Sequence, residues 1–401
     1  MPYKGNSVVA VMLVGGSAKR LWPYTGPWQS KATLRVAGKR LAYYNADLID
    51  DANIDRLVVP VQFNSDEVRK KLTFEGYRFE NNVEFTKANQ LYFPNDIRPH
   101  FRGTADAVKQ SEEALKGFKY MIIVPCDHIT NVDYSELVKK AIFNWENYGA
   151  ISTVGAMTKD EKEIKETFGN PKIDENGRVT GWAEKPKEPI SNIASLGIYA
   201  CPVEPMLKAM ELSGGFDFGE HVMKYVMDKG LLYVHYYPGE KYYWNDVGQP
   251  QLLLKANMDL IDGVKGIKIP LVKVDRVKTG FGGLIENSIV SKDEPVIYGS
   301  VRHSVVGDHC TIAPDVEISD SVLMGTNIIL RTGGNGAKGM EIRNSVIGKY
   351  SVVSDSSPLD GVFIGKASKI HGCKIKNGVK IDSDTVRFNE KIDGDLKLKE
   401  W

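Results

Sequence analysis

Cationic and acidic side chains follow buried strands at several points of this sequence, where they could handle a phosphorylated ligand. The apolar run at residues 8–14 leads into Gly15 and Gly16, and then into Lys19 and Arg20. Glycines let a backbone come close to a ligand, and two cations just beyond such a turn predict a bound anion. A plain strand-to-helix connection with solvated charges is the alternative interpretation of this turn taken alone.

Four further stretches carry residue types suited to phosphate chemistry: FRGTADAV (101–108), PCDHI (125–129), GWAEKPKEP (181–189) and YYWNDVGQP (242–250). Asp127 directly follows an apolar run, and Asp246 precedes a Val-Gly turn. Carboxylate oxygens are ligands that Mg²⁺ prefers. Taken singly, Asp127 could cap a helix and Asp246 could make an Asx turn. The occurrence of all these stretches in one domain favours a shared binding site.

The elements that must position these residues alternate between strands and helices. Apolar runs at 8–14, 56–61, 120–127 and 151–157 predict strands, and the amphipathic stretches 104–117 and 134–149 predict helices. Strand and helix alternating at this spacing predict a mostly parallel sheet with helices on both faces. Ligands bind at the carboxyl ends of such strands, where both GGSAKR and PCDHI fall.

A different pattern begins after residue 262. Apolar residues recur every six positions, first at Val306, Ile312, Ile318, Met324 and Leu330, with a second row at Val316, Val322 and Ile328. Similar pairs return at Ile347/Val353, Ile364/Ile370 and Ile375/Ile381. A hexapeptide period predicts a parallel β-helix, with a β-sandwich as the alternative. The glycine-rich interruption at 331–341 predicts a protruding loop. We therefore expect a domain at 1–262 and a β-helix at 263–401.

The bulk composition is that of an ordinary soluble protein. The 401 residues include 52 basic and 51 acidic ones, so composition favours neither a nucleic-acid nor a membrane partner. The four scattered cysteines form no CxxC pair, which predicts reduced thiols and a cytoplasmic location. The first apolar run ends in GGSAKR rather than at a small-residue cleavage site, so we expect no secretory signal.

In this order the stretches resemble the sugar-1-phosphate nucleotidyltransferases, and most closely the glucose-1-phosphate adenylyltransferases. That family opens with GGxGTRLxPLT and a following lysine, and carries RGTADAV, GDHIY, EKP, DFG and YWxDVG. This sequence has GGSAKRLWPYT, RGTADAV, CDHI, AEKP, SLGIYA, FDFGEH and YWNDVGQ. The resemblance covers residues 8 to about 262 and implies a Rossmann-like mixed sheet, while the tail fits the left-handed parallel β-helix of the same enzymes.

The resemblance also implies an activity and a set of residues. Such enzymes join a sugar 1-phosphate, here most simply glucose 1-phosphate, to an NTP such as ATP and release pyrophosphate. Arg20, Lys31 and Asp127 match catalytic positions, and Asp127 and Asp246 match ligands of Mg²⁺. The remaining matches are nucleotide-binding Gly15, Gly16, Gln90, Gly103 and Thr104, and sugar-phosphate-binding Gly169, Glu184, Lys185, Ser195 and Asp217. Lys19 stands where the family has a hydroxyl and is either a further nucleotide-binding cation or a solvated lysine, and Trp244 either stacks on the sugar or has a structural role. A homo-oligomer, dimer or tetramer, is expected.

Departures from the family pattern leave the choice of nucleotide and sugar open. Ala18 and Lys19 replace Gly-Thr, Cys126 replaces a glycine, and Phe101 stands where tyrosine is common. UTP, GTP or dTTP with another sugar 1-phosphate is therefore an alternative. A non-catalytic regulatory subunit is a second alternative, although Arg20 and Lys31 are retained. An acyltransferase in the β-helix is a third, which the tail histidines do little to support.

Overall fold

The computed structural model describes residues 7–16, 19–25, 29–62, 65–88, 100–280, 282–331, 339–356 and 358–397. Contacts divide the chain into two compact units. The first consists of Met1–Gly16 and Ala42–Trp244, and the second of Ser17–Leu41 and Asn245–Trp401. The predicted boundary between residues 262 and 263 stays a prediction. Within these described ranges, no helix combines the length and the apolar character needed to cross a membrane.

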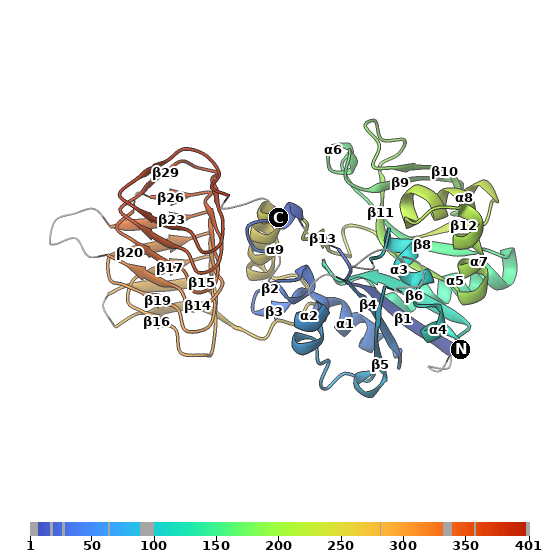
Figure 1. Ribbon diagram of the computed structural model, residues 1–401, viewed down its shortest axis with the longest axis horizontal. Helices are drawn as coiled ribbons and strands as arrows, with labels where there is room; N and C mark the ends of the chain where they lie inside the picture. Colours follow the sequence, from blue (N-terminus) through green and yellow to red (C-terminus); the bar gives the residue numbers. More distant parts are fainter. Residues whose placement is uncertain are drawn as a thin grey trace. The chain divides into compact units, whose positions relative to one another are not determined.

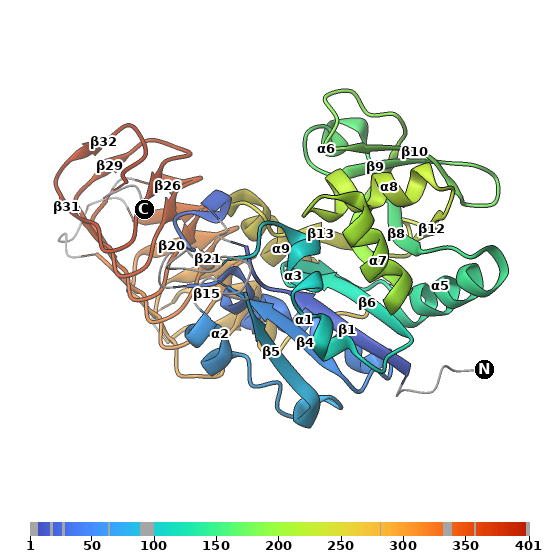
Figure 2. The same ribbon diagram turned by 45° about the vertical axis from the view of Figure 1, so that its right-hand side comes forward.

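A seven-stranded mixed sheet forms the centre of the first unit. Its order is β12-β8-β11-β6-β1-β4-β5, and Figure 2 shows β5, β4, β1 and β6 side by side. Only β11 runs antiparallel to its neighbours, β6 and β8, among the pairings of this sheet. The strands are β1 Val8–Leu13, β4 Leu57–Val61, β5 Val83–Lys87, β6 Tyr120–Pro125, β8 Ser152–Thr158, β11 Ile193–Pro202 and β12 Leu232–Tyr236. The predicted mostly parallel sheet is confirmed.

Both faces of the sheet are buried. Val9 and Val11 of β1 point into a core shared with α3, α7 and α8, while the intervening Ala10 and Met12 are also fully buried. Because successive side chains of a strand face opposite ways, the continuous apolar run of β1 reflects cover on both sides. The helices are α1 Leu41–Asp51, α2 Ser65–Lys71, α3 Thr104–Lys109, α4 Glu112–Leu115, α5 Tyr134–Tyr148, α6 Glu161–Ile164, α7 Val203–Ser213, α8 Met223–Asp228 and, in the second unit, α9 Pro250–Asp262.

The helix predicted at 104–117 is wrong in its continuity, because the structure divides it into α3 and α4. Between them, the hydroxyl of Ser111 donates to the carbonyl of Ala107 at 2.8 Å, a local bond that competes with continued helix. The helix predicted at 134–149 is confirmed as α5. It begins after Asp133, whose carboxylate accepts from two backbone amides, and ends at Gly149 with φ 66°.

Short parallel strands stacked in coils form most of the second unit (Figure 1). One sheet has the order β26-β23-β20-β17-β15-β18-β21-β24-β27-β30, and another the order β16-β19-β22-β25-β28-β31. Only the β14–β15 pair is antiparallel among the described pairings of this tail. The predicted β-helix is confirmed. The strands are β14 Val272–Lys278, β15 Leu284–Val290, β16 Val296–Ile297, β17 Ser300–Arg302, β18 Val305–Val306, β19 Thr311–Ile312, β20 Val316–Ser319, β21 Val322–Leu323, β22 Ile328–Leu330, β23 Met340–Arg343, β24 Val346–Ile347, β25 Val352–Ser354, β26 Leu359–Asp360, β27 Phe363–Ile364, β28 Lys369–His371, β29 Lys374–Ile375, β30 Lys380–Ile381, β31 Val386–Phe388 and β32 Lys391–Ile392.

The strict six-residue spacing predicted for the tail is wrong after Ile318. Leu323 and Ile329 are fully buried, whereas the predicted Met324 and Leu330 are only partly buried, and Ile328 is 39% exposed. Several stacked positions of successive coils are 17 residues apart, one less than three steps of six, so one step between buried positions spans five residues. The pairs from Ile347 to Ile381 face the core as predicted.

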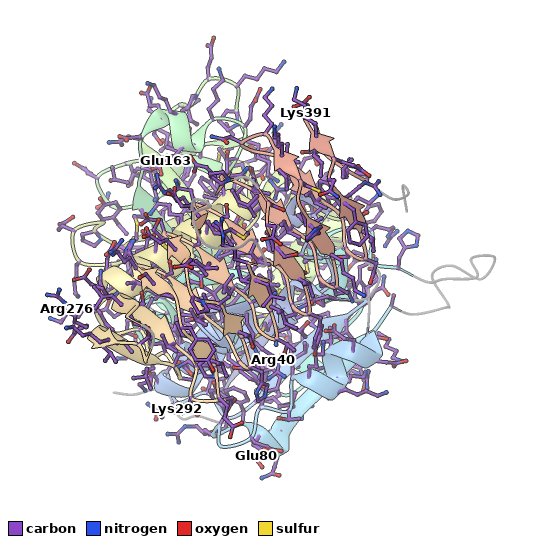
Figure 3. The ribbon with its side chains drawn as sticks, turned by 90° about the vertical axis from the view of Figure 1, so that its left-hand side faces the viewer. Arg40, Glu80, Glu163, Arg276, Lys292 and Lys391 are labelled. Atoms are coloured by element: carbon purple, nitrogen blue, oxygen red, sulfur yellow. The ribbon has the colours of Figure 1, made fainter. Side chains whose placement is uncertain are left out.

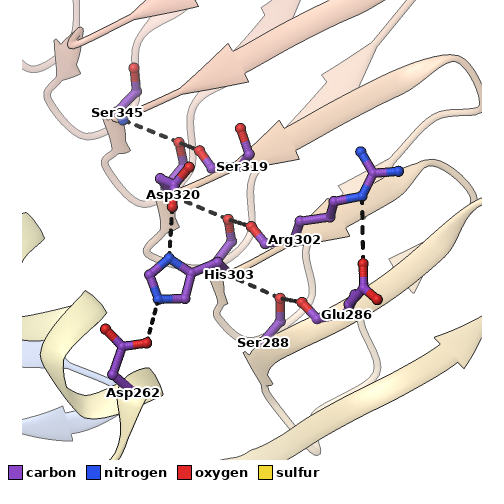
Figure 4. Close-up of polar contacts among 10 residues, drawn as sticks. Asp262, Glu286, Ser288, Arg302, His303, Ser319, Asp320 and Ser345 are labelled. Carbon is purple, nitrogen blue, oxygen red and sulfur yellow. Dashed lines mark hydrogen bonds and ion pairs between the residues drawn. The ribbon is translucent and has the colours of Figure 1, made fainter.

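A column of buried serines joins the coils at one corner (Figure 4). The amide of Ser304 donates to the hydroxyl of Ser288 at 3.2 Å, and the amide of Ser321 donates to that of Ser304 at 3.1 Å. The amide of Ser345 continues the column to Ser321. All four serines are fully buried, so these bonds satisfy polar groups that the corner withdraws from water.

Charged side chains cover the outside of the coils. Arg276, Lys292 and Lys391 are exposed and project from the surface in Figure 3. The predicted loop at 331–341 lies mostly outside the described residues, and its last two residues belong to β23.

Candidate active site

The predicted site residues fall into two groups, one in each unit. The first unit holds Gly15, Gly16, Gly103, Thr104, Asp127, Gly169, Glu184, Lys185, Ser195, Asp217 and Trp244, and the second holds Lys19, Arg20, Lys31 and Asp246. Gln90, predicted to bind the nucleotide, lies outside the described residues.

The two glycines that follow β1 differ in their surroundings. A β-carbon at Gly15 would lie 3.4 Å from Cδ2 of Phe101, so the backbone there runs against an aromatic ring. Phe101 is itself held by a bond from its amide to Oε1 of Gln62 at 2.6 Å. No described atom lies within 4 Å of a β-carbon at Gly16. The backbone at Gly16 is therefore the more accessible to a ligand.

Asp127 lies just beyond the carboxyl end of β6, beside a histidine that sequence reasoning left without a role. Oδ1 of Asp127 is 3.8 Å from Nε2 of His128. The other ring nitrogen, Nδ1, accepts a hydrogen bond from the indole of Trp244 at 3.0 Å. Trp244 was predicted to bind the sugar phosphate, but it is 5% exposed and packs on Phe168 with ring centroids 4.7 Å apart. This packing leaves little of its face for a ligand.

Thr104 and Asp217 come together although they are far apart in the sequence. The hydroxyl of Thr104 donates to Oδ2 of Asp217 at 3.0 Å and accepts from the amide of Phe218 at 3.0 Å. A β-carbon at Gly103 would lie 2.4 Å from the carbonyl oxygen of Phe216, so the close approach requires glycine. That same carbonyl accepts from the amide of Ala105 at 2.9 Å, which occupies one donor at the start of α3.

The predicted sugar-phosphate residues Gly169, Glu184 and Lys185 form one cluster at the ends of β9 Gly169–Ile173 and β10 Val179–Glu184. Nζ of Lys185 lies 3.2 Å from Oε1 of Glu184. β-Carbons at Gly169 and Gly219 would lie 3.0 and 2.1 Å from Oε2 of Glu184, so both glycines make room for this carboxylate. Burial raises the pKa of Glu184, Lys185 lowers it, and the charges of Asp217 and Glu220 raise it, with a net rise.

Ser195 lies on β11, where the strand register shifts, and its hydroxyl accepts from the amide of Gly197 at 3.2 Å. Sequence reasoning missed Trp182, whose indole donates to the carbonyl of Gly219 at 2.8 Å. The sequence pattern could have identified Trp182. It lies two residues before Glu184 on β10, and alternate residues of a strand share a face.

In the second unit, two cations and a carboxylate gather around Gly248. Arg20 belongs to the short turn Lys19–Leu21 and Lys31 to the turn Lys31–Thr33. Nζ of Lys31 lies 3.5 Å from Oδ1 of Asp246. A β-carbon at Gly248 would lie 3.5 Å from that same oxygen and 3.8 Å from Nη2 of Arg20. The guanidinium of Arg20 and the ammonium of Lys31 are donors that suit phosphate oxygens.

Oδ1 of Asp246 is the atom in this cluster that best fits a metal ligand. It is buried and, among the described residues, accepts no hydrogen bond. Nζ of Lys31 lies 3.5 Å from this oxygen, and divalent cations also take buried carboxylate oxygens. Asp127 offers the same donor type in the first unit.

Comparison with known proteins shows the family of this chain. A family model described as "Nucleotidyl transferase" matches residues 9–263. The glucose-1-phosphate adenylyltransferase of Acetivibrio thermocellus is 27% identical over 81% of this chain and 78% of its own length. The small subunit, chloroplastic/amyloplastic, of the Triticum aestivum enzyme is 26% identical over 94% of this chain and 89% of its own. The glucose-1-phosphate adenylyltransferase of Trichlorobacter lovleyi is 26% identical over 94% of this chain and 90% of its own length. Because the family model matches well over half of its length, this chain belongs to the nucleotidyl transferase family.

Proposed function

We propose that this protein joins glucose 1-phosphate to ATP, forming ADP-glucose and releasing pyrophosphate. The observation that carries the proposal is the gathering of Arg20, Lys31 and Asp246 around Gly248 in a chain of the nucleotidyl transferase family. The relatives named glucose-1-phosphate adenylyltransferase supply the choice of substrates. The pair of Glu184 and Lys185 in the first unit supports a sugar-phosphate site.

The reaction needs positioning and charge stabilisation rather than a protein nucleophile. A phosphate oxygen of the sugar 1-phosphate attacks the α-phosphorus of the NTP. A new phosphorus–oxygen bond forms as the bond to the β-phosphate breaks, and pyrophosphate leaves with its electron pair. Negative charge shifts toward the leaving group, so we assign Arg20 and Lys31 to the phosphates that gain it. Lys185 is assigned to the sugar phosphate.

We further propose that Asp127 and Asp246 hold one Mg²⁺. The donor chemistry of both residues supports this assignment, and so does the buried Oδ1 of Asp246, which pairs with Lys31 but accepts no hydrogen bond from the described residues. When bound, the ion neutralises phosphate oxygens and stabilises the charge that grows on them. We also propose a cytoplasmic enzyme, in keeping with four free, buried cysteines, that assembles as a homo-oligomer, dimer or tetramer, and binds neither nucleic acid nor membranes.

One alternative is a subunit that binds these substrates without turnover. The small-subunit name of the Triticum aestivum relative makes this alternative worth testing. The other is the same reaction with UTP, GTP or dTTP and another sugar 1-phosphate. One assay separates all three: the purified protein is incubated with Mg²⁺, each NTP in turn and a panel of sugar 1-phosphates, and pyrophosphate release is measured. We expect the highest kcat/KM with ATP and glucose 1-phosphate.

The Asp246→Asn variant tests the assigned carboxylate in the same assay. We expect kcat to fall by several hundredfold, because losing a carboxylate proposed to hold Mg²⁺ at the reacting phosphates removes about 3 to 4 kcal/mol of transition-state stabilisation. Asp275→Asn, an exposed position on β14, is the matched control and should keep wild-type kcat. Near-normal turnover of Asp246→Asn at saturating Mg²⁺ would remove this residue from the mechanism. If none of the NTPs supports pyrophosphate release, the regulatory-subunit alternative is favoured.

A further inference from the structure

The residues that follow Arg20 are attached to coils of the β-helix hundreds of positions away in the sequence. The indole Nε1 of Trp22 donates to Oδ1 of Asp382 at 3.0 Å. The hydroxyl of Tyr24 donates to the backbone carbonyl of Val346 at 2.8 Å. All of these residues belong to the second unit, so the attachment is internal to one compact body.

Further contacts hold the same segment. The hydroxyl of Ser383 donates to the carbonyl of Pro23 at 3.3 Å, and Nζ of Lys397 lies 5.3 Å from the centre of the Trp22 ring. Oδ1 of Asp382 also accepts from the amide of Ser383 at 2.8 Å. This second bond orients the carboxylate that accepts from Trp22. Successive residues 22, 23 and 24 are thus each bonded to the tail.

Burial makes this attachment rigid. Leu21 is fully buried and Tyr24 is 6% exposed, and burial raises the pKa of the Tyr24 hydroxyl well above its ordinary value. A buried phenol hydroxyl without a hydrogen-bond partner costs free energy. Breaking the bond from Tyr24 to the Val346 carbonyl would therefore destabilise the segment.

Backbone bonds transmit the attachment to Arg20. The amide of Trp22 donates to the carbonyl of Lys19 at 3.3 Å, and the amide of Tyr24 donates to that of Leu21 at 3.1 Å. Arg20 lies inside the first of these turns. A shift of Trp22 therefore moves the backbone that carries the guanidinium, while the exposed side chain of Arg20 itself lies beside Gly248.

We propose that Asp382 is a positioning residue for Arg20, so that the β-helix sets the geometry of a catalytic cation. This inference rests on the proposed function. Asp382 acts through Trp22 and contacts no substrate. The carboxylate is suited to this role because a hydrogen bond to a charged acceptor is stronger than one between neutral groups. A displacement of about 1 Å at a reacting group can cost about a hundredfold in rate.

Variants at both ends of the bond test the proposal in the full-length protein. Asp382→Ala removes the acceptor, Trp22→Phe removes the donor, and Asp382→Asn keeps a carbonyl oxygen that can accept. We expect the first two to lower kcat by about ten- to a hundredfold, with little change in KM for the sugar phosphate. Asp382→Asn should recover most of the activity. The double variant Trp22→Phe, Asp382→Ala should be no worse than Asp382→Ala alone, because the bond from Trp22 is already lost in that variant.

The matched control is Asp393→Ala, since Asp393 is an exposed tail carboxylate that pairs with Lys391 at 2.8 Å. It should keep wild-type kcat. The inference is overturned if Asp382→Ala also keeps wild-type kcat, or if Asp382→Asn lowers kcat as much as Asp382→Ala does.

Hydrogen–deuterium exchange of the backbone at residues 19–25 separates this inference from the proposed function. Asp382→Ala should speed exchange there and Asp393→Ala should not, whether or not the protein turns over. If the wild type releases no pyrophosphate from any substrate pair, the proposed function fails and exchange decides the positioning: equal exchange in the two variants overturns it, and faster exchange in Asp382→Ala alone supports it.

Discussion

At the scale of single residues, Glu184 should lower the stability of the protein at neutral pH while it contributes to binding of the sugar phosphate. Burial and the nearby acidic charges raise its pKa above the ordinary value despite Lys185. A carboxyl whose pKa is raised by folding stabilises the folded state at low pH, and that contribution is lost as the pH rises through the folded-state pKa. We therefore expect Glu184→Gln to raise Tm at neutral pH, and to raise the KM for the sugar phosphate by about tenfold through loss of a charged acceptor.

Calorimetry at several pH values and steady-state kinetics check this expectation. The gain in Tm should shrink as the pH falls below the raised pKa, where the wild-type carboxyl is already neutral. Glu188→Gln is the control, since Glu188 is exposed in the same stretch and should change neither quantity. A Glu184→Gln protein that is less stable at neutral pH would contradict the role assigned to burial.

Residue types and motif order placed Glu184 and Lys185 in one predicted site, but could not show how these side chains are held. Glu184 and Lys185 are adjacent in the sequence and lie together, as expected. The close fit of Gly219 against Glu184 joins positions 35 residues apart, and the bond from Trp244 to His128 spans 116. Such long-range contacts depend on the packing of separate elements, which no local pattern encodes.

At the scale of elements, His303 ties α9 to the coils (Figure 4). Its Nε2 lies 3.0 Å from Oδ1 of Asp262, the last residue of α9, and its Nδ1 lies 2.6 Å from Oδ1 of Asp320 in the next coil. Partial burial alone would lower the pKa of His303, but the hydrogen bonds and charges of Asp320 and Asp262 outweigh it and raise the pKa. The protonated ring can donate to both carboxylates at once.

The raised pKa predicts a pH-dependent junction. The stabilisation is fully present below the unfolded value, 6.5 for histidine, and is lost as the pH rises through the folded-state pKa. We expect His303→Gln to lower Tm at pH 6 and to approach the wild-type Tm at pH 9, as thermal unfolding across that range would measure. His309→Gln is the control, because His309 is exposed and holds a similar corner with φ 50° against 44° for His303. If His303→Gln lowered Tm by the same amount at every pH, the ion pairs of His303 with Asp262 and Asp320 would be excluded as the cause.

The six-residue repeat of the tail predicted its fold but not its register. The six-residue rows predicted a β-helix because apolar side chains must face inward on every side. They did not reveal the five-residue step after Ile318, since Met324 and Leu330 are as apolar as the residues that are actually buried, Leu323 and Ile329. Register is decided by stacking on neighbouring coils, such as Ile312 against Ile329, rather than by composition.

At the scale of the whole molecule, the tail should be needed for activity because it holds the turn that carries Arg20. Ile329 is fully buried in the tail core and its neighbour Ile328 is 39% exposed, so the two give a matched pair. Ile329→Ala should lower the free energy of unfolding by about 2 to 5 kcal/mol, the usual cost of a large-to-small change in a core. Ile328→Ala should cost about 0.5 kcal/mol or less.

The decisive comparison is between unfolding and loss of turnover on heating. Since Trp22 and Tyr24 are bonded to the coils, activity should disappear with the transition that Ile329→Ala lowers, even where circular dichroism shows the helices of the first unit still folded. Pyrophosphate release measured along the same temperature series tests this directly. Activity that outlasts the melting of the coils would mean that the tail is only attached to the enzyme, whereas activity lost together with them would make the β-helix part of the catalytic apparatus.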